Sequence, residues 1–134
     1  MAVNAIHGMG PKVVLVTSYR DDRMAEEKTI SMLASDKSGL YRVCTPELPL
    51  GRGIAGTGDL TAAVFLSRYL ETGNLKKTLE LTAASVYGIL EASFLEREST
   101  RVAIDNSYLE LLIIRAQNEL TSPAHFFEAV KINP

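Results

Sequence analysis

Apolar positions in the first third of the chain follow the spacings of β-strands. The run KVVLVTS (12–18) is continuous and rich in β-branched residues, which predicts a strand buried on both faces of a sheet. The segment TISMLASD (29–36) alternates and is followed by the turn DKSG, so LYRVCTPEL (40–48) is predicted to return as its hairpin partner. Residues 2–9 have the pattern of a helix end, closed by GMGPK.

The second half of the chain has helical spacing. Residues 60–70 are apolar on almost every side, which predicts a centrally buried helix. A second helix is predicted from residue 75 to about 96 and a third over 109–120. Gly88, inside the second helix, indicates the close approach of another backbone or a ligand. The stripe of the second helix consists of Leu75, Leu79, Thr82, Val86, Leu90 and Ser93, and that of the third of Leu109, Leu112, Ile113, Ala116 and Leu120.

The predicted elements are few strands followed by three helices, which is a small number of strands for an α/β fold. A strand of the kind at 12–18 needs parallel neighbours, and the chain offers too few of them to surround it. Either the fold is small and unusual, or the 134 residues are the C-terminal part of a larger α/β unit.

Composition limits the choice of partners and compartment. With 46% hydrophobic residues and a formal net charge of -2, one domain is expected, and neither nucleic acid nor an anionic membrane is predicted as a partner. The single cysteine, Cys44, forms no internal disulfide, and no Cys/His spacing suggests a metal site. The sequence shows no signal-peptide pattern and no apolar stretch of about 20 residues, so a cytoplasmic protein is expected.

A cluster of glycines precedes the first long helix. In GRGIAGTGDL (51–60), Gly56, Thr57 and Gly58 come directly before a helical pattern whose first turn contains Asp59. Glycines leave backbone N–H groups accessible and a helix N-terminus carries partial positive charge, so the segment is a candidate anion site. The alternative is a simple turn in which Asp59 only caps the helix. The segment is neither a Walker A loop nor a dinucleotide fingerprint.

In these motifs the sequence resembles the ribokinase-like small-molecule kinases, and among them the pyridoxal kinases. The shared segments are KVVLVTS (12–18), GTGDLTAAVFLSRYLE (56–71), LKKTLELTAASVYGILEAS (75–93) and YLELLIIRAQNELTSPAHFFEAVKI (108–132). The glycine motif is common to sugar, nucleoside and pyrimidine kinases. The pattern that indicates pyridoxal kinases is carried by Glu110, Leu111, Ala116, Gln117, Pro123 and Phe127.

The resemblance implies a reaction and a set of site residues. The fold implied is the C-terminal part of a ribokinase-like three-layer α/β/α sandwich, with residues 1–134 as one nucleotide-binding and catalytic portion and the N-terminal half absent. Asp59 is implied as the substrate-binding catalytic base, and Gly56, Thr57 and Gly58 as the anion hole over the γ-phosphate. The implied ATP contacts are Thr17, Ser18, Leu50, Gly51, Arg52, Thr57, Val86 and Leu90.

The implied activity is ATP- and Mg²⁺-dependent phosphorylation of the 5′ hydroxyl of pyridoxal or a related B6 vitamer. No metal ligands are assigned to this chain. Family members are usually homodimers, so a homodimer is expected of the complete protein. Because the family's chains are about twice this long, the 134-residue chain alone is expected to be inactive. The alternatives are a hydroxymethylpyrimidine kinase and a non-catalytic nucleotide-binding fragment.

Overall fold

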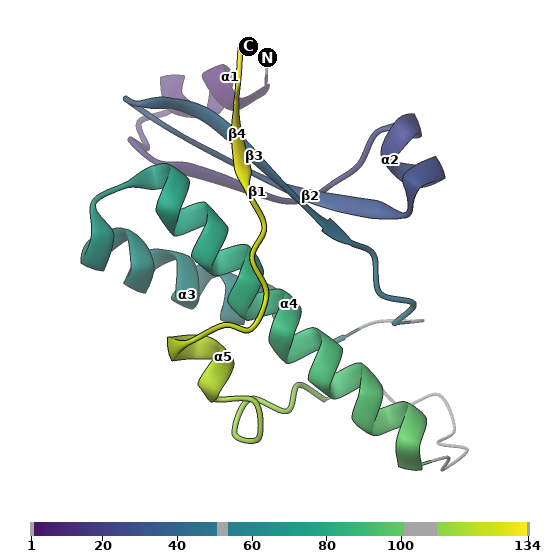
Figure 1. The fold of residues 1–134 in the computed structure, drawn as a ribbon. Coiled ribbons are helices and arrows are strands. Elements are labelled where there is room, and N and C mark those ends of the chain that lie inside the picture. The colour runs from purple at the N-terminus through teal and green to yellow at the C-terminus, as the bar shows by residue number, and fades with distance from the viewer. Residues whose placement is uncertain (1, 51–53, 101–109, 134) are drawn as a thin grey trace.

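The computed structural model describes residues 2–50, 54–100 and 110–133 of the chain. These residues form an α/β fold in which the helices lie on both sides of a sheet (Figure 1). In chain order the elements are α1 (Ala2–Gly8), β1 (Val14–Tyr19), α2 (Asp22–Glu27), β2 (Thr29–Asp36), β3 (Gly39–Pro46), α3 (Thr57–Thr72), α4 (Leu75–Thr100), α5 (Asn118–Thr121) and β4 (Ala129–Ile132).

The sheet has four strands in the order β1-β2-β3-β4, and every neighbouring pair is antiparallel. The predicted hairpin is confirmed, because β2 and β3 pair from Thr29↔Pro46 to Asp36↔Gly39. Its turn is closed by Asp36, whose Oδ1 accepts a hydrogen bond from the backbone N–H of Ser38 at 2.7 Å. The C-terminal strand β4 pairs with β3 and was not predicted, since its four residues AVKI carry no readable alternation.

Strand β1 departs from its prediction. Its neighbour β2 is antiparallel, and β1 lies at an edge of the described sheet. Only Val14 in this strand is buried, at 7% exposure, so the prediction of a strand buried on both faces is wrong for the described chain. The continuous apolar run is typical of a strand that is covered on both faces, but the described residues cover β1 only partly.

Two apolar clusters, one on each face of the sheet, define three layers. The larger cluster joins the sheet to α3 and α4, and the smaller one joins it to α1 through Val3. Helix α2 lies on the same face as α1, because Met24 accepts a hydrogen bond from Ser31, which is two residues from Leu33 and therefore on the same face of β2. The larger cluster contains Ala34, Val43, Phe65, Leu75, Leu79, Ala83 and Ala129.

The predicted first and second helices are confirmed as α3 and α4. Helix α3 is not buried on all sides, however, because Leu66 and Leu70 are 58% and 76% exposed. The third predicted helix is wrong in extent. Residue 109 lies outside the described residues, and of 110–120 only the start of the four-residue α5 is helical. The preceding segment is tied to α4 instead, through a 3.0 Å hydrogen bond from the N–H of Leu112 to Ser93.

The predicted close approach at Gly88 is confirmed, but the group that approaches is a side chain and not the predicted backbone or ligand. A Cβ built at Gly88 would lie 2.9 Å from Cγ of Glu119, which is too close for ordinary packing. The approaching group is thus a side chain from α5, and Glu119 also accepts a hydrogen bond from the N–H of Ala124 at 3.0 Å.

Candidate active site

A cavity of about 630 Å³ opens where one end of the sheet meets the N-terminus of α3 and the middle of α4. It is formed by the end of β1, the start of β2 and the end of β3, so it lies at one end of the hairpin. Of the residues proposed from the sequence, Thr17, Ser18, Leu50, Thr57, Gly58, Val86 and Leu90 line it. The fold therefore brings together residues that lie up to 73 positions apart in the chain.

The N-terminus of α3 contributes backbone donors to this cavity. The residue before the helix is Gly56, which has a φ of 87° and makes no side-chain cap. The first turn of a helix has N–H groups without intrahelical partners, and here no capping side chain takes them. Thr57 and Gly58 line the cavity, and the N-terminus of a helix is in general a favourable place for an anion.

Asp59 stands in the first turn of α3 with an exposed side chain. It is not the helix cap, because Gly56 holds that position. Gly56 and Asp59 flank the two cavity-lining residues but do not line the cavity themselves. The neighbouring Thr61 does, and its hydroxyl donates to the carbonyl of Thr57 at 2.7 Å, which fixes the first turn.

An irregularity in β1 directs Thr17 and Ser18 into the site. The β1–β2 register shifts between Val16 and Tyr19, as in a β-bulge. Within it, Ser18 has a φ of 56°, a left-handed conformation that is uncommon for a residue other than glycine. Strain of this type is held in place by surrounding structure and is concentrated at functional sites.

The walls of the cavity combine apolar and charged groups. Val86 and Leu90 lie on consecutive turns of α4, and Leu50 faces them from the loop after β3. The guanidinium of Arg97 donates to the carbonyl of Leu50 at 3.3 Å, so α4 also holds this loop. At the rim, Arg20 and Glu47 form an ion pair at 2.5 Å. Gly51 and Arg52, also proposed as ATP contacts, lie outside the described residues.

Tyr87 is a cavity-lining residue that the sequence did not reveal. It lies off the apolar stripe of α4, and its surroundings come from the distant segment before β4. The ring stands edge-on to His125 and Phe127, with centroid distances of 4.8 and 5.1 Å. Burial, and secondarily the negative charge of Glu91, raise the pKa of the Tyr87 hydroxyl. At neutral pH it is therefore a hydrogen-bond donor beside an apolar wall.

The described residues contain no group of three or more His, Cys, Asp or Glu side chains placed to hold a metal ion. Among the helices described, none is both long and apolar enough to cross a membrane.

Comparison with known proteins finds relatives over nearly the whole chain, although no family model matches it. A pyridoxal kinase PdxY from Rubrobacter xylanophilus is 40% identical over 122 residues, which are 91% of this chain and 38% of that protein. PdxY from Leifsonia xyli is 36% identical over 132 residues, covering 98% of this chain and 42% of the relative. The resemblance to the pyridoxal kinases is confirmed. The chain spans about two fifths of the length of these curated relatives.

Solved pyridoxal kinases share the fold. The enzyme from Leishmania donovani in complex with ADP and pyridoxamine superposes with a TM-score of 0.76 and 20% identity, over 98% of this chain and 43% of the other. Pyridoxal kinase from Entamoeba histolytica gives a TM-score of 0.72 and 19% identity, over 98% and 42%. The predicted fold class, part of a ribokinase-like α/β/α sandwich, is thereby confirmed.

Proposed function

We propose that this chain forms the C-terminal, nucleotide-binding and phosphoryl-transfer part of a pyridoxal kinase. The observation that carries the proposal is the N-terminus of α3, which is preceded by glycine, lacks a side-chain cap and opens on a cavity with an aliphatic wall. That combination suits a phosphate chain at one end and a base at the other. The relatives named pyridoxal kinase support the substrate class.

In the proposed arrangement the γ-phosphate of ATP lies at the N–H groups around Gly56, Thr57 and Gly58. Negative charge that develops on its oxygens during transfer meets donors already oriented by the helix. The adenine ring lies against Val86 and Leu90, while Thr17 and Ser18 contact the nucleotide from the bulge of β1. Leu50, with Gly51 and Arg52, forms the loop over ATP.

Asp59 is the proposed general base. Its carboxylate is exposed, and no described residue forms a hydrogen bond or ion pair with it. It takes the proton from the 5′ hydroxyl of the vitamer as the alcohol oxygen bonds to the γ-phosphorus and the bond to ADP breaks. The products are the 5′-phosphate and ADP.

Mg²⁺ enters this proposal only as the ion that accompanies the nucleotide phosphates. Magnesium is commonly held by substrate phosphates with one or two carboxylates, and no protein cage is found among the described residues. No step is assigned to the metal. The homodimer and the cytoplasmic location expected of such a kinase belong to the same proposal.

The chain alone is expected to bind nucleotide but to phosphorylate pyridoxal very slowly. A base without the rest of the substrate pocket cannot hold the hydroxyl in line with the phosphate. Phosphorylation of pyridoxal by this chain at an ordinary enzyme rate of about 10 per second would contradict that part of the proposal. A panel of pyridoxal and hydroxymethylpyrimidine, assayed with a longer kinase chain that contains these residues, separates the two kinase functions.

Titration calorimetry with ATP tests the nucleotide site directly. The variant Gly58→Ala should weaken binding at least about tenfold, because a methyl group would stand between the phosphate and the backbone. A Cβ there meets no atom within 4 Å, so the fold is expected to remain intact. Gly8→Ala is the matched control, since it is equally uncrowded and lies in α1. Equal affinities for both variants would refute the phosphate position.

Asp59→Asn separates binding from catalysis. The substitution should leave ATP affinity within about twofold while lowering phosphorylation by a longer kinase chain at least about a hundredfold. Retained turnover would rule out Asp59 as the base. If ATP binds but a longer kinase chain that contains these residues phosphorylates no vitamer, the alternative of a non-catalytic nucleotide-binding fragment is favoured.

A further inference from the structure

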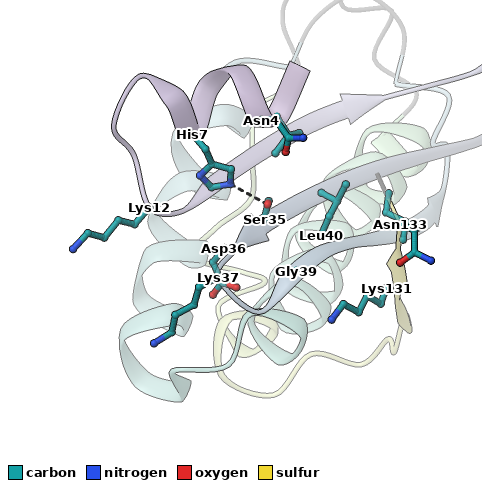
Figure 2. A pocket seen from close by; sticks show the side chains of 12 residues that line it. Asn4, His7, Lys12, Ser35, Asp36, Lys37, Gly39, Leu40, Lys131 and Asn133 are labelled. Carbon is teal, nitrogen blue, oxygen red and sulfur yellow. Dashed lines mark hydrogen bonds between the residues drawn. The ribbon is translucent and has the colours of Figure 1, made fainter. Parts of the chain in front are cut away.

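A second cavity, of about 380 Å³, lies at the opposite end of the sheet from the candidate active site. It is bounded by α1, the β2–β3 turn and the end of β4, whereas the first cavity opens at the end of β1 and the start of β2. Figure 2 shows side chains from all three segments around it, including His7, Ser35, Lys37 and Lys131. The two cavities share no lining residue.

The charges around this second cavity are mostly positive. Lys12, Lys37 and Lys131 contribute three ammonium groups, against the single carboxylate of Asp36. The local excess of two positive charges stands out in a chain whose formal net charge is -2. Among the described residues, neither Lys12 nor Lys37 has an ion-pair or hydrogen-bond partner for its ammonium group.

Hydrogen bonds hold the carboxylate of Asp36. Its Oδ1 accepts from the N–H and the hydroxyl of Ser38, at 2.7 and 2.5 Å, and its Oδ2 accepts from the hydroxyl of Tyr69 at 3.0 Å. The Tyr69 contact draws Asp36 toward the α3 face of the sheet, away from α1. The carboxylate is thus held by hydrogen bonds within the fold, and neither Lys12 nor Lys37 forms an ion pair with it, although the charge of Lys37 helps to lower the pKa of Asp36.

Lys131 is a positioned cation rather than a freely moving surface lysine. Its ammonium donates to the carbonyl of Ser38 at 2.8 Å and lies 5.9 Å from the centre of the Tyr41 ring. The side chain crosses the turn at Gly39, where a Cβ would lie 3.0 Å from Nζ of Lys131. Gly39 has a φ of 135° and leaves room for this side chain, so the hairpin is shaped to fit it.

His7 and Ser35 form a fixed polar wall on the α1 side. Nδ1 of His7 lies 2.8 Å from the carbonyl of Pro11, and Nε2 lies 2.9 Å from Oγ of Ser35 (Figure 2). A carbonyl can only accept, so Nδ1 carries a hydrogen. Ser35 is 7% exposed, and the buried Val3 and Leu40 provide an apolar floor.

We propose that this cavity binds a small organic anion that carries two or more negative charges, such as a phosphate monoester or a polycarboxylate. The lysine ammonium groups act as point charges for its oxygens, while the floor of Val3 and Leu40 accepts its carbon skeleton. The volume lies within the range of small-molecule sites. The site does not depend on the proposed kinase activity, because it lies at the other end of the sheet.

Residue-resolved NMR titration tests the site with two probes, inorganic phosphate and citrate, against potassium chloride at equal ionic strength. A saturable shift of the backbone amide signals of Ser35, Lys37 and Lys131 is expected with at least one probe and not with chloride. Saturation by phosphate assigns the phosphate class, and saturation by citrate assigns the polycarboxylate class. A response that does not saturate, or that matches chloride, overturns the proposal.

Two variants with the same change in net charge distinguish a specific anion site from non-specific electrostatic attraction to the protein. Lys12→Gln/Lys37→Gln should weaken binding of the saturating probe at least about tenfold, because two ammonium groups that line the cavity are lost. Lys28→Gln/Lys77→Gln removes the same charge from exposed positions outside the cavity and should leave affinity within about twofold. All four lysines are exposed, so folding should be unaffected. An equal loss in both variants would show an adventitious ion only and would overturn the proposal.

Discussion

Nε2 of His125 lies 2.6 Å from Oε2 of Glu91, so the segment before β4 is tied to the side of α4 that faces the candidate active site. The same imidazole meets the edge of Tyr87 and stacks on Phe127 at 5.8 Å. Through this pair, residues near the C-terminus support a wall of the cavity. The arrangement couples the charge of Glu91 to the ionisation of Tyr87.

Glu91→Gln should therefore lower the pKa of Tyr87 toward its ordinary value, because one of the two causes of the raised pKa is removed while burial remains. A pH titration of the Tyr87 ring signals by NMR measures this. Glu98→Gln, on an exposed position of the same helix, is the control and should leave the pKa unchanged. An unchanged pKa in Glu91→Gln would contradict the coupling.

The raised pKa of Tyr87 also affects the stability of the fold. The native chain keeps the Tyr87 proton to higher pH than the unfolded chain does. The free energy of unfolding should therefore fall as the pH rises above about 10, and fall less steeply in Glu91→Gln.

Ser18→Gly should raise the free energy of unfolding by about 1 kcal/mol, since glycine adopts a φ of 56° without steric cost. Urea unfolding measures the change. Ser67→Gly, on the exposed face of α3, should instead lower stability by about 0.5 kcal/mol, because glycine is less favourable than serine inside a helix. If Ser18 contacts the nucleotide as proposed, the stabilised variant should also bind ATP more weakly. A loss of stability in Ser18→Gly would argue against strain in the bulge.

Gly88 and Glu119 should show strong non-additivity. In the Glu119→Ala background, Gly88→Ala should stabilise the chain by about 0.5 to 1 kcal/mol, the ordinary helix preference for alanine. In the natural chain that gain should be cancelled. The added Cβ displaces the Glu119 side chain and breaks its hydrogen bond from Ala124. A double-mutant cycle in urea measures the difference, and equal effects in both backgrounds would exclude the contact.

Asp36 should contribute to acid sensitivity. Burial acts to raise its pKa, but the hydrogen bonds from Ser38 and Tyr69, together with the charge of Lys37, outweigh burial, so the pKa lies below its ordinary value. A depressed carboxyl pKa stabilises the fold above about pH 4, and this stability is lost as the pH falls through the native value. Tyr69→Phe should cost about 1 kcal/mol at pH 7 and much less at about pH 2. If Tyr69→Phe lowers the free energy of unfolding equally at both pH values, the variant has lost only packing and not the hydrogen bond to the Asp36 carboxylate.

What the sequence predicted well depends on local signals. The hairpin of β2 and β3 has alternation and a DKSG turn, and α4 has an uninterrupted stripe from Leu75 to Ser93. The glycine-rich entry to α3 was recognised because its chemistry lies within consecutive residues. The prediction for residues 110–120 failed because helical spacing there reflects packing along α4, through Leu112 and the buried Ala116, rather than a helix.

Features that depend on distant pairing were not predictable. Strand β4 is defined by its partner β3, with Ile132 opposite Leu40, and four residues cannot specify such a register. Tyr87 became a site residue only when His125 and Phe127 were placed beside it. The exposure of Leu66 and Leu70 was also missed. Apolar residues on every side of a helix do not show which of its sides are covered by other elements.

The division of the apolar interior between the two faces of the sheet has a consequence for hydrogen exchange. Helix α1 is seven residues long and is joined to the sheet through the smaller cluster, in which Val3 is its buried residue. Its amides should therefore exchange through local opening, well before those of α4, without unfolding of the larger cluster. Because His7 lies on α1 and borders the second cavity, an anion bound there would slow this exchange. The opening of one short helix would then report the occupancy of a site far from the candidate active site.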